Sequence, residues 1–190
     1  MTIPQIPTRE RMTLIEVARA SISHGLTHRK PLEIDPDTFD GVLARPGASF
    51  VTLKIEGKLR GCIGRIDPDG PLICSVARNA YAAAFDDPRF EPLTEPEFAP
   101  LDVHISVLSE PARMAFDGED DLLRQLRPGV DGLVLEAGRC RGTFLPAVWQ
   151  TLPQPQQFLN QLKVKAGLHP DAWPEDARVL RYTCESIGEE

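Results

Sequence analysis

A tight hairpin followed directly by a helix constrains the fold of this chain more than any other feature of its sequence. In residues 49–55 apolar side chains alternate with polar ones, which is the period of a half-buried β-strand. Glu56-Gly57 supplies a turn, and residues 58–64 are predicted to form the returning strand. From residue 71 to 85 apolar residues recur at helical spacing, which indicates an amphipathic helix. The chain therefore combines antiparallel strands with helices.

The remaining segments predict the same mixture, without a regular alternation of strand and helix. Residues 31–46 are acidic and turn-rich, and we interpret them as a connector. This irregular order favours an α+β fold over a doubly wound sheet. We expect helices at 9–24 with Gly25 as the stop, at 120–127, and at 156–166 with Gly167 as the stop, a strand at 102–108, a second hairpin at 132–145 that turns at Ala137-Gly138, and a last strand at 179–184.

The composition is that of an ordinary globular protein, with 42% hydrophobic and 26% charged residues. A length of 190 residues suits one domain, or one domain with two lobes. We expect a single domain over residues 1–190, in which residues 1–8, with Pro4 and Pro7, form an extended N-terminal segment. The 21 basic and 28 acidic residues give a net charge of −7, which disfavours nucleic acid as a partner.

The cellular setting follows from the N-terminus and the cysteines. The N-terminus lacks the basic and apolar regions of a signal peptide, and no apolar run approaches the ~18 residues of a membrane span. Cys62, Cys74, Cys140 and Cys184 lie far apart and form no CxxC pair. We therefore expect reduced thiols in a cytoplasmic protein with no metal site and no membrane contact. No standard nucleotide-binding loop is present, so the sequence assigns no cofactor.

The segment Arg60-Gly61-Cys62-Ile63-Gly64 is the most unusual one, because two glycines flank a thiol inside a predicted strand. Glycine in a strand often marks a place where a ligand or another backbone comes close. Exposed N–H groups there can hold an anion, and Arg60 adds a fixed positive charge. A thiol beside an arginine also meets the first requirement of a nucleophile. The alternative is that Cys62 is a small buried apolar residue, as free cysteines commonly are.

A second group of polar residues follows this hairpin. Asn79 is a poor choice for a helix interior, so we expect its amide to make a specific hydrogen bond. Asp87 and Arg89 either orient a substrate or pair with each other to fix a loop. His104 points away from its apolar neighbours in a predicted strand, and it is either a general base for Cys62 or a solvent-facing side chain.

The two predicted hairpins resemble each other locally. The run Gly57-Lys58-Leu59-Arg60-Gly61-Cys62 can be laid on Gly138-Arg139-Cys140-Arg141-Gly142-Thr143. In each, a turn glycine precedes a basic residue, then any residue, then Arg-Gly and a small nucleophile-type side chain. Either both hairpins present Arg-Gly corners to one cleft, with Arg141 and Thr143 as binding residues, or the match arose by chance.

Six ordered blocks of residues span most of the chain: Leu59-Arg60-Gly61-Cys62-Ile63-Gly64, Asn79-Ala80, Ala83-Ala84-Phe85-Asp86-Asp87-Pro88-Arg89-Phe90 with Pro92-Leu93, Ile105-Ser106-Val107-Leu108, Arg141-Gly142-Thr143-Phe144-Leu145-Pro146 and Lys165-Ala166-Gly167-Leu168. Together these blocks resemble the AMMECR domain family, whose bacterial and archaeal members are called AmmeMemoRadiSam system protein A. The resemblance implies a two-lobed α+β fold with a mainly antiparallel sheet and flanking helices.

The resemblance also implies partners in a prokaryotic cytoplasm. Relatives are often encoded with, or fused to, a Memo-like protein and a radical-SAM protein, which indicates a step in a modification pathway. We expect such partners of this chain to be separate proteins. Two positions depart from the family pattern: Arg65 follows the signature where a small residue is usual, and His104 stands where relatives more often carry an acidic or other polar residue.

Two hypotheses of function follow. In the first, the chain is an enzyme or part of an enzyme system, Cys62 is the nucleophile or covalent acceptor, and arginines hold an anionic group. In the second, the same cleft is a non-catalytic site that binds a peptide or a small ligand, or docks the two partner proteins. Under both, the candidate binding residues are Arg60, Gly61, Gly64, Asn79, Asp87, Arg89, Arg141 and Thr143.

Overall fold

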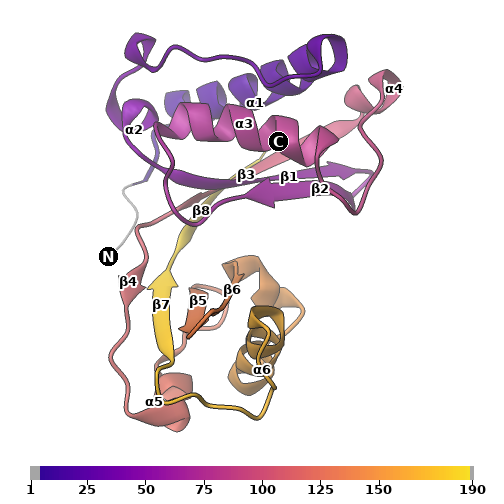
Figure 1. The fold of residues 1–190 in the computed structure, drawn as a ribbon. Helices are drawn as coiled ribbons and strands as arrows, with labels where there is room; N and C mark the ends of the chain where they lie inside the picture. Colours follow the sequence, from indigo (N-terminus) through magenta and orange to yellow (C-terminus); the bar gives the residue numbers. More distant parts are fainter. Residues whose placement is uncertain (1–4, 189–190) are drawn as a thin grey trace. The chain divides into compact units, whose positions relative to one another are not determined.

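The two β-sheets of this protein belong to different parts of the chain. A computed structural model describes residues 5–188, which divide into two compact units (Figure 1). The first unit comprises the described residues up to Leu108 and those from Glu185 onward, and the second is Ser109–Cys184. The predicted α+β class with two lobes is therefore confirmed. Of the predicted extended segment, residues 1–4 lie outside the described residues, and the first helix already begins at Thr8.

The first unit has a four-stranded antiparallel sheet in the order β2-β1-β3-β8. Two long helices, α1 and α3, pack against each other and cover one face of this sheet (Figure 1). The elements of this unit are α1 (Thr8–His28), η1 (Pro36–Thr38), α2 (Gly41–Ala44), β1 (Ala48–Ile55), β2 (Lys58–Gly64), α3 (Leu72–Phe85), α4 (Glu95–Phe98), β3 (Leu101–Leu108) and β8 (Cys184–Gly188).

The second unit has its own four-stranded sheet, in the order β4-β7-β5-β6. Its core contains Trp149, which stacks on Phe158 at 3.8 Å between ring centroids and donates a hydrogen bond to the carbonyl of Asp131. Its elements are β4 (Ala112–Arg113), α5 (Gly118–Gln125), β5 (Gly132–Ala137), β6 (Cys140–Phe144), η2 (Pro146–Gln150), α6 (Pro155–Ala166) and β7 (Arg178–Tyr182).

The β1–β2 hairpin forms as predicted. Glu56 and Gly57 have φ angles of 52° and 75°, which are the left-handed values of a tight two-residue hairpin turn. Val51 and Leu53 are fully buried in the core, whereas Thr52 between them is half-buried on the other face. The strand alternation therefore produces one face toward the helices and one face away from them.

The predicted stop of the first helix at Gly25 is wrong. Helix α1 continues to His28 and ends where Arg29 adopts a left-handed φ of 55°. Gly25 is buried inside the helix, and a Cβ there would overlap the ring of Phe85 on α3. This glycine therefore lets two helices approach closely and does not cap the first one.

The predicted last strand at 179–184 is correct only up to Tyr182 and is not the last one, because the chain changes sheets within it. β7 ends at Tyr182 in the second sheet, and β8 begins at Cys184 in the first. Between them, the backbone of Thr183 exchanges hydrogen bonds with Ser109: its carbonyl accepts from Ser109 N–H, and its N–H donates to Ser109 Oγ. A partner far away in the sequence therefore interrupts the strand.

The other differences from the prediction are small. The second hairpin turns at Gly138-Arg139, one residue later than expected, because Gly138 adopts a positive φ of 55°. The expected connector 31–46 contains the short elements η1 and α2. Helix α5 begins at Gly118 and ends at Gln125, two residues earlier at each end than the predicted helix.

Candidate functional site

Cys62 lies in the edge strand β2, on the face of the first sheet that is turned away from α1 and α3. It pairs with Thr52 of β1, and Thr52 Oγ1 lies 3.3 Å from Cys62 Sγ. Cys62 is half-buried and forms no disulfide. The thiol therefore has a hydroxyl as its side-chain neighbour and lies outside the apolar core of the unit.

Alternate residues of three neighbouring strands line this face. Thr52 has Cys62 as its partner on one side and His104 of β3 on the other. Two residues before Thr52 in β1, on the same face, Phe50 is paired with Ser106 of β3. All five side chains are half-buried. We call this set of residues the Cys62 face.

Asp87 and Arg89 bind the backbone of Cys62 from outside the sheet. Asp87 Oδ2 accepts a hydrogen bond from Cys62 N–H at 2.9 Å, and Arg89 Nη2 donates one to the Cys62 carbonyl at 3.3 Å. Arg89 Nε and Nη2 also donate to the two carboxylate oxygens of Asp87, at 2.9 and 2.7 Å. Because β2 is an edge strand, these side chains stand in for a neighbouring strand. We call this pair the Asp87–Arg89 clamp.

The Asp87–Arg89 clamp consists of a buried carboxylate and a partly exposed guanidinium. The side chain of Asp87 is 2% exposed and that of Arg89 is 54% exposed. Hydrogen bonds from Arg89, and a further one from the N–H of Cys62, hold the pKa of Asp87 well below its ordinary value in spite of its burial. The hydrogen bond to Asp87 raises the pKa of Arg89. Both groups are therefore charged at neutral pH, and of the two alternatives from the sequence, the structure contains the ion pair.

Arg60 is bound to Glu97 of α4. Its Nε and Nη2 donate to the two carboxylate oxygens of Glu97 at 2.8 and 3.1 Å. This pairing, with hydrogen bonds from Thr94, lowers the pKa of Glu97 to about 2. The Arg60 side chain is 14% exposed, and its Nη1 is buried without a hydrogen-bond partner among the described residues. Two of its nitrogens thus connect β2 to α4.

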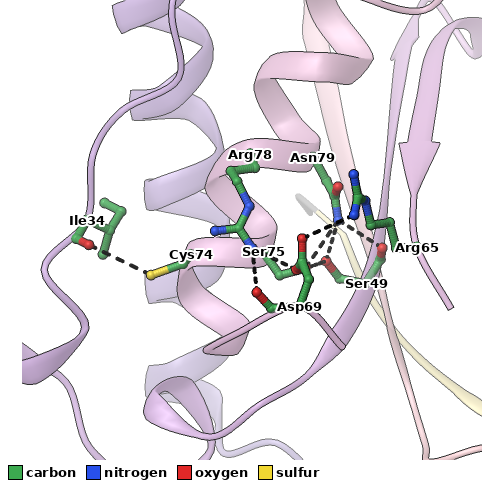
Figure 2. A network of polar contacts seen from close by, with 8 residues as sticks. All are labelled: Ile34, Ser49, Arg65, Asp69, Cys74, Ser75, Arg78 and Asn79. Atoms are coloured by element: carbon green, nitrogen blue, oxygen red, sulfur yellow. Dashed lines mark hydrogen bonds and ion pairs between the residues drawn. The ribbon is translucent and has the colours of Figure 1, made fainter. Parts of the chain in front are cut away.

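Asn79 lies on the helix side of the first sheet, between α3 and β1, as Figure 2 shows. Its Nδ2 donates to the carbonyl and the Oγ of Ser49, both at 3.0 Å, and to Ser75 Oγ at 3.3 Å. The residue is buried. The expected specific hydrogen bond is thus confirmed, and the amide nitrogen is used inside the fold, on the opposite side from the Cys62 face.

Gly64 and Arg65 end the β2 segment. Gly64 pairs with Phe50, and a Cβ at this glycine would overlap the Phe50 ring. Arg65 donates its backbone N–H to the Ser49 carbonyl, and its side chain is 69% exposed, with Nη1 3.6 Å from Asp69 (Figure 2). The extra charge at this position therefore lies on the surface.

Gly61 and Gly142, the glycines of the two Arg-Gly motifs, meet the same packing requirement in the two units. A Cβ at Gly61 would overlap the carbonyl oxygen of Ala83 on α3. A Cβ at Gly142 would lie 2.8 Å from the backbone nitrogen of Ala166 on α6. In each unit an edge strand approaches a helix so closely that a side chain does not fit. This gives the local similarity of the two hairpins a physical cause.

Arg141 and Thr143 belong to the second unit, whereas the other candidate residues belong to the first. Thr143 Oγ1 donates to the carbonyl of Leu133 at 2.8 Å and lies 2.9 Å from the hydroxyl of Tyr182. Arg141 Nε pairs with Glu136 at 3.1 Å. These groups therefore have partners within their own sheet, and a cleft shared by the two hairpins stays a prediction.

The comparisons with known proteins agree with this fold. The family model AMMECR1 matches residues 15–187. The chain belongs to the AMMECR1 family. It is 37% identical to a protein of Methanothermobacter thermautotrophicus in an alignment 187 residues long that covers 95% of each chain. It is 35% identical to a protein of Thermococcus kodakarensis, with 93% of this chain and 89% of that one covered. The crystal structure of an uncharacterized protein from Pyrococcus horikoshii matches with a TM-score of 0.89 at 35% identity, covering 97% of this chain and 94% of that one.

Membership of the AMMECR1 family confirms the resemblance seen in the sequence, but two important contacts of the site were not predicted. Glu97 is one, because it lies in a short loop helix and meets Arg60 only in the folded chain. Thr52 is the other, because its pairing with Cys62 depends on a β-bulge between Leu53 and Lys54. The alternation of β1 signalled which face Thr52 occupies, but not which residue lies opposite.

In this AMMECR1-family chain, residues 5–188 contain no group of three or more His, Cys, Asp or Glu side chains arranged to hold a metal ion. Over the same residues, none of the helices combines the length and the apolar character that crossing a membrane requires.

Proposed function

We propose that this AMMECR1-family protein is a binding component of a modification pathway, and that the Cys62 face takes an anionic small ligand or peptide. The observation that carries the proposal is the Asp87–Arg89 clamp, which fixes a charged, half-exposed guanidinium at the strand that bears Cys62. Because Nε and Nη2 of Arg89 are already bound to Asp87 and to the Cys62 carbonyl, Nη1 is the nitrogen left to donate to a carboxylate or phosphate, and the fixed side chain loses little entropy when it does so. Arg60 and Asn79 are less suited to this role than Arg89, because the Arg60 side chain is only 14% exposed and Asn79 is buried.

Paired alkylating reagents test this site without knowledge of the ligand. Iodoacetate is an anion and iodoacetamide is its neutral counterpart, so the ratio of their rates at one cysteine reports local attraction of anions. We expect this ratio to be higher at Cys62 than at Cys140, measured by peptide mass spectrometry. Inorganic phosphate should lower the ratio at Cys62 by competing for the guanidinium.

The variants Arg89→Lys and Arg89→Gln test whether the Arg89 guanidinium causes the preference for iodoacetate at Cys62. Lysine keeps the charge and should keep part of the preference for iodoacetate, whereas glutamine should reduce the ratio at Cys62 to that of Cys140. Circular dichroism checks that both variants fold. If the wild-type ratios at the two cysteines are equal, or if Arg89→Gln leaves the Cys62 ratio unchanged, the anion site is rejected.

A second function, nucleophilic catalysis by Cys62, is favoured by one specific observation. Thr52 lies beside the thiol at 3.3 Å and has His104 as its next neighbour across the strands. In a reaction, Cys62 sulfur would add to a carbonyl carbon of the substrate, the electron pair of the C=O π bond would move to the oxygen, and the thiol proton would pass through the Thr52 hydroxyl to His104. This arrangement would give the row of three side chains a catalytic role.

Alkylation by neutral iodoacetamide separates the two functions. An activated Cys62 reacts rapidly at about pH 7, where an ordinary thiol, with a pKa of about 8.5, is mostly protonated. We then expect His104→Asn and Thr52→Val each to slow Cys62 but not Cys140. If Cys62 reacts no faster than Cys140 at this pH, the catalytic role is rejected and the binding role is kept.

We also propose that a Memo-like protein and a radical-SAM protein act with this chain in the cytoplasm. The family resemblance supports the partners, and the four unpaired cysteines support a reducing compartment. Co-elution of the purified chain with a Memo-like protein from the same organism in size-exclusion chromatography is the expected result. Separate elution at micromolar concentrations would contradict a stable complex.

A further inference from the structure

A pocket in the second unit has a separate set of residues that could bind a ligand. It is formed by β4 and the residues that follow it, together with the segment that leads into β7, and its volume is about 530 Å³. This volume lies within the roughly 300–1,000 Å³ of typical small-molecule sites. The pocket contains no residue of the Cys62 face, so an inference from it does not depend on the function proposed above.

Two aromatic rings form a fixed wall of the pocket. Phe116 and Trp173 both line it, and their rings meet edge to face with centroids 5.7 Å apart. The ammonium of Lys163 lies 5.5 Å from the Trp173 ring centroid. Lys163 is itself 1% exposed and is held by Glu119 at 2.7 Å and by the carbonyl of Pro170 at 3.0 Å. The indole is therefore positioned before any ligand arrives.

Two arginines add positive charge to the same pocket. Arg113 of β4 pairs with Leu180 of β7, and Arg178 lies two residues before Leu180, so both arginines lie on the face of the sheet away from the core residue Val179. Both are exposed, and neither guanidinium makes an ion pair or hydrogen bond to a side chain or backbone group of residues 5–188.

The balance of charge in the pocket favours an anion. Glu175 contributes one carboxylate to the lining, so two arginines and one glutamate give a formal charge of +1. The chain as a whole carries −7. A pocket of this sign on an acidic protein attracts anions over its other surfaces.

We propose that this pocket binds a small ligand that joins a flat aromatic group to a carboxylate or a phosphate. The aromatic group would pack against the Phe116–Trp173 wall, where ring contacts are favourable. The acid group would be bound by Arg113 and Arg178, whose planar donors match carboxylate and phosphate oxygens. Both parts of the ligand are needed, because the wall offers only ring contacts and the arginine pair only charged donors.

Tryptophan fluorescence measures this binding directly. The chain has two tryptophans, and Trp149 is buried in a stack with Phe158, so quenching by a ligand reports on Trp173. We expect saturable quenching by phenyl phosphate or by benzoate, and the tighter of the two identifies the acid group. Benzyl alcohol and inorganic phosphate, which each lack one part of the ligand, should bind at least about tenfold more weakly. The variant Trp173→Phe should abolish the signal.

Matched arginine variants complete the test. Arg113→Gln and Arg178→Gln should each weaken binding of the tighter probe by about tenfold, the loss of roughly one charge-assisted hydrogen bond. Arg124→Gln removes an exposed arginine of α5 outside the pocket lining and should leave binding unchanged. Equal binding of benzyl alcohol, inorganic phosphate and the aromatic acids by the wild type would overturn the proposal without any variant. Equal effects of all three substitutions on binding would also overturn the proposal, as would the absence of saturable quenching by both aromatic acids.

Discussion

Asp87 has the character of a substrate-binding residue, but its side chain binds backbone groups of the protein itself. Its carboxylate accepts hydrogen bonds from the N–H groups of Cys62 and Arg89 and from the Arg89 side chain. A buried carboxylate with this many donors is stable only while it is ionised. Asp87 therefore holds the strand that carries Cys62, and Arg89 is the part of the pair left partly exposed to a ligand.

The pH dependence of stability should report this role. Because the folded-state pKa of Asp87 is lowered, its contribution to the free energy of unfolding is complete above the unfolded pKa of about 3.9, and it is lost as pH falls through the folded value. We expect Asp87→Asn to destabilise the protein by about 3 kcal/mol at pH 7. The difference from wild type should shrink below about pH 4, as measured by urea unfolding.

Asp86 provides the control for this substitution. It is the neighbouring aspartate, it is exposed, and its side chain makes no hydrogen bond to the described residues. Asp86→Asn should change stability by less than about 0.5 kcal/mol at every pH. Equal effects of the two substitutions would show that the clamp does not stabilise β2.

At the scale of secondary-structure elements, a single extra residue decides the geometry of the site. The turn at Glu56-Gly57 sets Ile55 opposite Lys58, and an uninterrupted ladder would place Thr52 opposite Gly61. The β-bulge makes Arg60 the extra residue, so that Thr52 lies opposite Cys62. The bulge therefore brings the thiol and the hydroxyl onto one face.

The packing of the edge strands on helices can be tested with two glycines. Gly61→Ala should destabilise the protein by about 1–3 kcal/mol, because its Cβ meets the backbone of α3 and cannot be relieved by a rotamer change. Gly142→Ala should act in the same direction through α6. Thermal unfolding monitored by circular dichroism measures both.

Leu59→Thr is the control within β2, since Leu59 is 44% exposed and threonine suits a strand. It should stay within about 0.5 kcal/mol of wild type. A neutral Gly61→Ala variant would contradict the close approach of β2 and α3.

At the scale of the whole molecule, the chain builds two hydrophobic cores. One contains the buried faces of α1, α3, β1 and β3, and the other contains those of α6, β5 and β7. Each sheet has its own helices on one face, so each unit buries apolar surface without borrowing residues from the other cluster. We therefore expect each unit to open locally without the other.

Hydrogen exchange of paired leucine variants tests this division. Leu162→Ala, in the core of the second unit, should remove about 2–5 kcal/mol and speed amide exchange mainly in α6 and β5. Leu53→Ala, equally buried in the first unit, should act mainly on α1, α3 and β3. If both variants speed exchange equally in all elements, the two units unfold as one.

Sequence reasoning identified the features that depend on neighbours along the chain. The β1–β2 turn, the apolar stripe of α3 and the Gly167 stop of α6 were correct, because turn chemistry and periodicity act over a few residues. The same reasoning identified Cys62 and its flanking glycines as unusual, since glycine and a thiol in a strand are conspicuous without a structure.

The tertiary structure alone decided where the candidate side chains find their partners. Gly25 could not be distinguished from a helix stop, because its reason is the Phe85 ring, 60 positions away in the sequence. The change of sheets at Thr183 likewise depends on Ser109. Hydrogen bonds and close packing between residues distant in the sequence leave no periodic pattern behind. The sequence by itself therefore determined the elements and the unusual residues, and the three-dimensional contacts determined which of those residues support the fold and which are left to meet a ligand.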